Sequence, residues 1–176
     1  MKLEEFNYNL PKELIAQEPA EPRDSCELMM LDKNTGAWEH HHFRDILDEI
    51  RPGDVFVFNN TKVIPARLYG KKRTTGGKVE MLLLTPKGND VWEVLVNPGR
   101  KALPGTEIEF SDSCYCKVLD KTDFGGRVVE FHYDGNFDSL LDQLGEMPTP
   151  PYIHKKLENK DEYQTVYAKY KGSAAA

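Results

Sequence analysis

A polar run that follows an apolar one carries the most suggestive chemistry in the sequence. Val55–Phe58 is apolar at four consecutive positions, which predicts a central strand buried on both faces. The next nine residues supply amides, a hydroxyl and cations, among them Asn60, Thr61, Lys62 and Arg67. Polar groups at the end of a buried strand are where mixed sheets place ligands. The structural alternative is a strand-end turn held by asparagine side chains.

A second polar stretch, Gln17–Ser25, lies between two apolar segments and contains Arg23 and Asp24 side by side. Adjacent opposite charges usually pair with each other, and such a pair contributes little to stability. Asp24 could instead face a cationic substrate, because a carboxylate and a cation each favour the other's charged form.

Histidines and cysteines would indicate a metal site, but their spacing does not support one. His40 and His42 share one face of a predicted strand, and two ligands are too few for a closed site. Cys114 and Cys116 have little freedom to bridge, and with Cys26 they complete no zinc pattern. We therefore predict no metal and reduced thiols. A metal-binding protein that uses the histidine run remains an alternative.

Aromatic, amide and basic side chains suggest a nucleic-acid surface. Tyr152, Gln164 and Thr165 lie in stretches rich in proline or tyrosine. Nucleobases stack on aromatic faces and pair with amides, although packing in a core explains aromatic residues equally well. Basic clusters lie at positions 67–78, 100–101 and 154–156, and a solvated surface is the commoner explanation of each. The net charge of −6 does not exclude RNA, because phosphates need only a local basic patch.

Two regions with different patterns of predicted elements would position these residues. The chain of 176 residues is 39% hydrophobic and 30% charged, an ordinary globular mixture with enough apolar surface for a core. No apolar run approaches the ~20 residues of a membrane helix. Short elements open the chain: a turn over Pro11–Ile15, a hairpin of Leu28–Leu31 with Ala37–His42, and an amphipathic helix over Phe43–Ile50. Near the other end, Asn136 caps a predicted helix that runs through Leu144.

From Lys62 to Asp134 short strands and turns alternate, with no helical period. Evenly spaced short strands tend to close into a barrel, which removes exposed edges. The six predicted strands are Lys62–Lys72, Lys78–Thr85, Val91–Asn97, Thr106–Phe110, Cys114–Lys121 and Arg127–Asp134. We therefore predict an α+β protein. Its mixed α/β domain comprises residues 1–61 and 148–176, and residues 62–147 form an inserted small antiparallel β-barrel.

Several of these segments, in this order, resemble one family closely. Leu14–Pro19 with Arg23 and Asp24 is similar to its opening motif, and Gly53–Leu68 to its central one. The match continues through Gly76–Glu80, Trp92–Val96, Pro98–Arg100, Pro150–Ile153, Tyr163–Ala168 and Gly172-Ser173 with the closing alanines. The family is the S-adenosylmethionine:tRNA ribosyltransferase-isomerases, and the resemblance covers essentially the whole chain.

The resemblance implies an α/β domain with an inserted barrel, and a reaction without metal or redox cofactor. The family's enzymes move the ribosyl part of S-adenosylmethionine, a substrate rather than a cofactor, onto 7-aminomethyl-7-deazaguanine. That base occupies the wobble position of tRNA with a GUN anticodon. The product is epoxyqueuosine, and adenine and methionine leave. The opening Met1–Glu5 lacks the pattern of a secretory signal. Together with this feature, the resemblance implies a cytoplasmic monomer with no membrane association.

Under this resemblance Asp24 is the candidate catalytic residue, a carboxylate beside the cationic sulfonium. The residues expected to bind substrate are Arg23, Asn60, Thr61, Lys62, Arg67, Arg100, Tyr152, Gln164 and Thr165. Among them, the side chains at 60 and 61 suit ribose or base, and the cations at 62, 67 and 100 suit phosphate. The residues at 152, 164 and 165 are expected to frame the pocket.

The sequence departs from the family pattern in places. Cys26-Glu27 stands where the family usually has Ser-Arg, and Lys62 and Asn97 each replace a usual arginine. The charge reversal at Glu27 weakens the case for anion binding there. Family members also run on well beyond Ala176, so we expect a truncated, cleaved or partly described chain that forms no epoxyqueuosine alone. A non-catalytic RNA-binding barrel protein is the alternative function.

Overall fold

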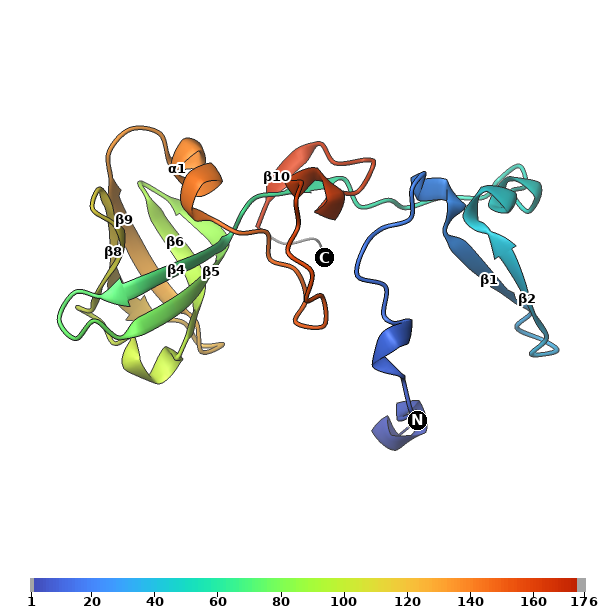
Figure 1. Ribbon diagram of the computed structural model, residues 1–176, viewed down its shortest axis with the longest axis horizontal. Coiled ribbons are helices and arrows are strands. Elements are labelled where there is room, and N and C mark those ends of the chain that lie inside the picture. The colour runs from blue at the N-terminus through green and yellow to red at the C-terminus, as the bar shows by residue number, and fades with distance from the viewer. Residues whose placement is uncertain (1, 174–176) are drawn as a thin grey trace. The chain divides into compact units, whose positions relative to one another are not determined.

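The computed structural model describes residues 2–173, so Met1 and the closing alanines 174–176 lie outside the described residues. The chain divides into two compact units (Figure 1). One comprises Met1–Val57 with Pro150–Glu162, and the other Phe58–Thr149 with Tyr163–Ala176. The domain boundaries expected from the sequence stay a prediction. No helix of the described part is long and apolar enough to cross a membrane.

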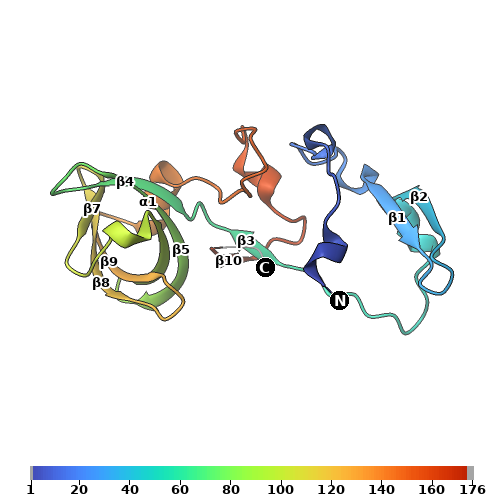
Figure 2. The ribbon, with the colours of Figure 1, turned by 90° about the horizontal axis from the view of Figure 1, so that it is seen from below.

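The second unit is built on a closed antiparallel β-barrel of strand order β4-β5-β6-β9-β8-β7 (Figures 1 and 2). Its strands are β4 (Arg67–Lys72), β5 (Lys78–Gly88), β6 (Val91–Asn97), β7 (Glu107–Ser111), β8 (Cys114–Lys121) and β9 (Arg127–Tyr133). Alternate residues point inward, as Val79, Met81 and Leu83 do on β5. The six-stranded antiparallel barrel predicted from the sequence is confirmed.

Helix α1 (Phe137–Leu144) packs against the barrel core through Leu140 and Leu141. The Asn136 side chain accepts a hydrogen bond from the Ser139 backbone N–H at 3.1 Å, so the predicted cap is confirmed. A β-carbon on Gly145, which ends the helix, would lie 2.1 Å from the carbonyl oxygen of Pro65. Glycine therefore permits the close approach of the chain to Pro65.

The predicted strand Lys62–Lys72 is instead two strands separated by a buried proline. β3 (Thr61–Val63) pairs in parallel with β10 (Tyr170–Gly172), whereas β4 begins at Arg67 and joins the barrel (Figure 2). Pro65 has no N–H to donate to a strand ladder, and the Ala66 N–H turns back to the carbonyl of Ile64 at 2.7 Å. The single-strand prediction was wrong for this reason.

The first unit contains an antiparallel hairpin of β1 (Glu27–Leu31) and β2 (Trp38–His42), which confirms the predicted hairpin. The predicted helix after it is a 3-10 helix, η4 (Phe43–Asp48), in which no residue is buried. The remaining 3-10 helices of the chain are η1 (Leu3–Phe6), η2 (Lys12–Leu14), η3 (Arg23–Ser25), η5 (Gly99–Lys101) and η6 (Lys160–Tyr163). Among residues 2–173 the chain is therefore mostly β, with one short α-helix.

The prediction of a buried strand at Val55–Phe58 was wrong. This segment belongs to none of the sheets in residues 2–173, and Val55 and Val57 are 87% and 92% exposed. An apolar run predicts a tendency to be buried, but burial also requires a neighbouring element that covers it. The local sequence does not specify that neighbour.

Candidate functional site

In the first unit, side chains of the Gln17–Ser25 loop hold a segment that is distant in sequence. The Gln17 carboxamide donates to the Tyr152 carbonyl at 3.1 Å and accepts from the His154 N–H at 2.7 Å. Arg23 Nη2 donates to the Glu162 carbonyl at 2.7 Å, and Lys155 forms an ion pair with Glu18. The loop therefore fixes the backbone around Tyr152, whose own side chain stays more than half exposed.

Asp24 lies in η3 with an exposed carboxylate. Its cationic partner is Arg44, whose Nη2 lies 3.9 Å from Oδ1, and both side chains are more than half exposed. A pair this long and this exposed contributes little. The neighbouring Arg23 donates to Glu162 rather than pairing with Asp24. The carboxylate can therefore accept a cation without first breaking a strong contact.

In the second unit, Asn60, Thr61 and Lys62 are placed by the β3–β10 pair. The Asn60 carbonyl accepts from the N–H groups of Lys169 and Tyr170, at 2.8 and 3.1 Å. The Asn59 side chain accepts from the Thr61 N–H at 2.9 Å, so the asparagine-held turn considered as the alternative is present. The backbone of this segment is thus fixed, while Lys62 stays exposed.

Gln164 is tied to the same segment by both ends of its carboxamide. Its Oε1 accepts from the Val63 N–H and its Nε2 donates to the Val63 carbonyl, each at 2.8 Å. The side chain thereby pairs with β3 as a neighbouring strand would. Thr165 Oγ1 accepts from the Tyr167 N–H at 3.3 Å. The structure therefore brings residues 60–62 and 164–165 together, with Gln164 holding the chain.

Arg67 lies at the start of β4 with a side chain that is 22% exposed. Its Nε is 3.1 Å from Glu80 Oε1, an electrostatic contact in which the N–H is not aligned on the carboxylate. Its Nη1 donates to the Thr149 carbonyl at 3.3 Å. Burial, and then the charges of Glu80 and Glu146, raise the pKa of the adjacent Tyr69. The predicted phosphate ligand at 67 thus already has a carboxylate beside it.

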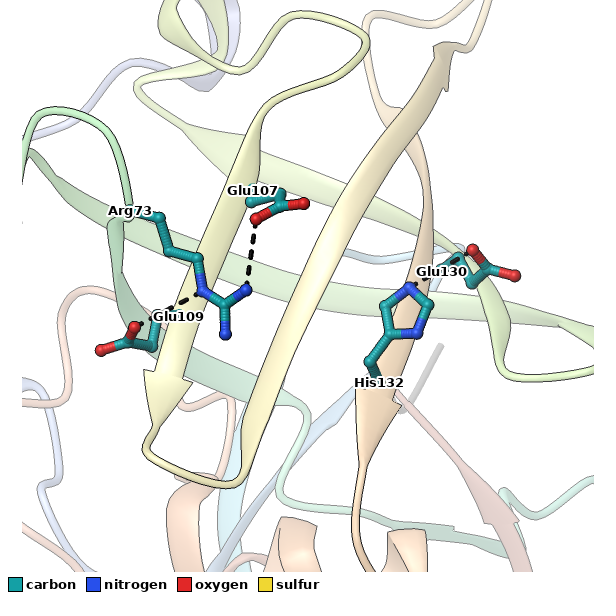
Figure 3. A network of polar contacts seen from close by, with 5 residues as sticks. All are labelled: Arg73, Glu107, Glu109, Glu130 and His132. Carbon is teal, nitrogen blue, oxygen red and sulfur yellow. Dashed lines mark hydrogen bonds and ion pairs between the residues drawn. The ribbon is translucent and has the colours of Figure 1, made fainter.

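Figure 3 shows a polar network on the barrel wall that the sequence analysis did not anticipate. Arg73 contacts Glu107 at 3.2 Å and Glu109 at 3.5 Å, and its guanidinium lies 3.7 Å from the ring centroid of Tyr115. Further along, His132 Nε2 lies 3.4 Å from Glu130. The network thus places the Arg73 guanidinium between two carboxylates, Glu107 and Glu109, so that cation already has partners within the protein.

Arg100, the remaining predicted site residue, lies exposed in η5. Beneath that turn is Arg127, which the sequence analysis did not single out. Arg127 occupies an inward position of β9 in alternation with Val129 and Phe131, and it is 6% exposed. A charged residue at an inward strand position was the available signal, because buried charges require specific partners.

The cysteines and histidines contribute no metal cluster in the described part of the chain, where no three metal-ligating side chains converge. Cys114 and Cys116 lie buried in the barrel. Burial raises the pKa of Cys114 to about 11 and that of Cys116 further still, which keeps both thiols protonated at neutral pH. The ring of His40 packs against Trp38, and His41 lies 3.2 Å from Glu39.

Comparison with known proteins extends over the whole chain. The family model described as "Queuosine biosynthesis protein" matches residues 3–176. The S-adenosylmethionine:tRNA ribosyltransferase-isomerase of Thermoanaerobacter sp. (strain X514) is 56% identical over 177 residues, which is 100% of this chain and 52% of the relative. The proteins of the same name from Symbiobacterium thermophilum and Clostridioides difficile (strain 630) are 54% and 53% identical, with the same coverage.

Among solved structures, the S-adenosylmethionine tRNA ribosyltransferase from Thermotoga maritima is 40% identical. The match covers 85% of this chain and 52% of that one, with a TM-score of 0.41. The chain thus spans about half the length of the curated relatives it matches.

Proposed function

Because the chain belongs to the queuosine biosynthesis protein family, we propose that it takes part in transferring and isomerising the ribosyl group of S-adenosylmethionine on tRNA. The acceptor is 7-aminomethyl-7-deazaguanine at the wobble position of tRNA with a GUN anticodon, and the product is epoxyqueuosine. The observation that carries this proposal is the family match over residues 3–176, joined by relatives more than half identical over the full chain.

The chemistry needs a base, a cation-binding group and a route for the leaving groups. The positive sulfonium acidifies the adjacent ribose carbon, so a general base can remove a proton there to give an ylide. The aminomethyl nitrogen loses a proton and forms the new bond to the ribosyl carbon. The bond from ribose to adenine and the bond from carbon to sulfur break, which releases adenine, with a proton, and methionine. The ring oxygen leaves the anomeric carbon and bridges two neighbouring carbons as the epoxide, while a new carbon–carbon bond closes the five ribose carbons into a cyclopentane.

Asp24 is the residue we propose beside the sulfonium. Its carboxylate is exposed, and its contact with Arg44 is long, so a sulfonium can take the place of the guanidinium. The exposed ring of Tyr152, held in place through Gln17, offers a face for a base.

The other predicted residues of the site divide by what their side chains already do. Arg23 and Gln164 enter the proposal as residues that hold the segments carrying the site. Asn60, Thr61 and Thr165 remain candidates for contacts to ribose or base. Phosphate contacts are proposed for three cations, Lys62, Arg67 and Arg100.

Adenine release tests the proposed reaction directly. A full-length protein that carries this chain is incubated with S-adenosylmethionine, with and without tRNA bearing the 7-aminomethyl base. We expect adenine only when that tRNA is present. A protein that binds the tRNA but releases no adenine would instead be the non-catalytic RNA-binding barrel.

Two aspartates of the first unit then test the assignment of the sulfonium contact. Asp24→Asn should lower kcat by about 10² or more, as expected for loss of a group acting on the transition state. Asp48→Asn, at an exposed carboxylate outside the proposed site, is the matched control and should keep wild-type kcat. Equal rates for the two variants would remove Asp24 from the mechanism.

We further propose that the protein is a cytoplasmic monomer. Light scattering behind size exclusion should give one copy per particle, and cell fractionation should place the protein with the soluble cytoplasmic enzymes. A dimer mass, or recovery with membranes, would contradict this part.

A further inference from the structure

Arg127 is a buried cation whose partners are all backbone carbonyls. Its Nη1 donates to the carbonyls of Gly126 and Gly125 at 2.7 and 2.9 Å. Its Nε donates to the carbonyl of Ala102 and its Nη2 to that of Gly99. Within residues 2–173 it forms no ion pair with a carboxylate.

A buried charge is stable only when it is paired or fully hydrogen-bonded. For Arg127 the hydrogen bonds are present, but carbonyl dipoles do not cancel a full charge. The guanidinium therefore leaves a positive potential at its end of the barrel, where the surrounding protein screens it less than water would.

Two of the four bonds also fix the shape of one turn. Gly99 and Ala102 flank Arg100 and Lys101, so the guanidinium holds the turn at both ends. The Lys101 carbonyl accepts from Lys72 Nζ, on β4. Three carbonyls of the turn are therefore occupied by cations of the barrel, while the side chains of Arg100 and Lys101 remain exposed.

This arrangement brings together four cations from three separate parts of the sequence. Lys72, Arg100, Lys101 and Arg127 take part in no ion pair among the described residues. Guanidinium groups bind phosphate through paired, charge-assisted hydrogen bonds, and ammonium groups add a point charge. An unneutralised cluster on a chain of net charge −6 is a local patch of the kind that an RNA backbone requires.

We infer that Arg127 is a positioning residue, which holds the turn over Gly99–Lys101 so that Arg100 and Lys101 contact a phosphate of the tRNA backbone. The inference rests on the proposed function for tRNA as the partner. It adds a residue that never reaches the RNA and acts through the two that do.

A double-mutant cycle on tRNA binding tests this role. Fluorescent tRNA is titrated with a full-length protein that carries this chain, as the wild type, Arg100→Ala, Arg127→Lys and the double variant, each over a series of salt concentrations. We expect Arg100→Ala to reduce the slope of log affinity against log salt by about one. Arg127→Lys keeps the charge but cannot reach both ends of the turn, so it should weaken binding by about fivefold alone and by less than twofold when Arg100 is already alanine.

The controls separate failure of this role from failure of the proposed function. Circular dichroism first confirms that each variant is folded, and Arg127→Lys is chosen over a neutral substitution because it keeps a cation in the site. Arg100→Lys should restore the wild-type slope, which a purely structural role for the turn would not require. Additive effects, or wild-type binding by Arg127→Lys, would overturn this inference alone. Absence of tRNA binding by the wild-type full-length protein would overturn it together with the proposed function.

Discussion

Two groups of cations on the same barrel differ in what neutralises them. The first group lies on the outer wall of the barrel, where a glutamate lies within 3.2 Å of each of four cations: Arg67, Lys71, Arg73 and Lys87. At the turn over Gly99–Lys101, the cations have backbone carbonyls or solvent instead. Charge on the wall is therefore balanced within the protein, whereas charge at the turn can be balanced by a ligand.

Lys71 and Lys72 are neighbours in the sequence but belong to different groups. They are adjacent in β4, and successive side chains of a strand point to opposite faces. Lys71 pairs with Glu109 at 3.2 Å, whereas Lys72 donates to the Lys101 carbonyl. A basic cluster in the sequence can thus contribute to two surfaces of opposite electrostatic character.

The largest expected effect comes from breaking the scaffold that carries both groups. Leu68 is fully buried, and Leu68→Ala should cost about 2–5 kcal/mol of unfolding free energy in a urea titration. Leu119→Ala, on the same barrel but 42% exposed, is the control and should cost about 1 kcal/mol or less. Equal losses would mean that the barrel core does not dominate the stability of this unit.

Replacing one arginine of each group should show that the two groups contribute differently to the free energy of unfolding. Arg127→Met removes a donor from four carbonyls, and those of Ala102 and Gly125 lose their side-chain partner, which should cost about 3 kcal/mol. Arg73→Met removes partly exposed ion pairs and should cost about 1 kcal/mol or less. The difference in urea midpoint checks this, and a larger loss for Arg73→Met would reverse the comparison.

Alkaline pH should weaken the barrel next to the wall network. A hydrogen bond to Asp90, and then burial, raise the pKa of Tyr133 to about 12 from its ordinary 10.0. Because the folded state keeps the proton more tightly, this contribution to stability is complete below pH 10 and is lost as pH rises toward 12. The stability difference between wild type and Tyr133→Phe should shrink across that window. A difference that is constant from pH 8 to 12 would contradict this, because Tyr133 would then hold its proton equally tightly in the folded and unfolded states.

Arg67 gives the smallest and most discriminating effect. The sequence assigns it to phosphate, whereas its neighbour Glu80 groups it with the wall. We expect Arg67→Ala to lower tRNA affinity and to make its salt dependence shallower, but by less than Arg100→Ala does. An unchanged slope would remove Arg67 from the phosphate contacts, and a decrease as large as that of Arg100→Ala would group it with the turn.

The barrel could be predicted from sequence because its information is local. Inward residues such as Val79, Met81 and Leu83 alternate with outward ones, and turns separate the strands. Two errors had physical causes that are not local. The strand predicted across Pro65 ignored its missing N–H, and burial of Val55–Phe58 depended on a covering element that the run does not encode.

The candidate site was harder to predict because polar side chains serve two purposes. Gln17 and Gln164 bond backbone groups 101 or more residues away, which no spacing rule reveals. Arg127 was missed although its inward position among Val129 and Phe131 marked it as a buried charge. Charged residues such as Asp24 and Arg100 could be proposed from their type and position alone, but the sequence could not show which cations already had a carboxylate.

The most direct test of the comparison is a paired salt titration of tRNA binding with a full-length protein that carries this chain. Arg100→Ala and Arg73→Ala each remove one arginine side chain from the barrel. We predict that Arg100→Ala reduces the salt slope by about one while Arg73→Ala leaves it at the wild-type value. Equal slopes for the two variants would contradict the account.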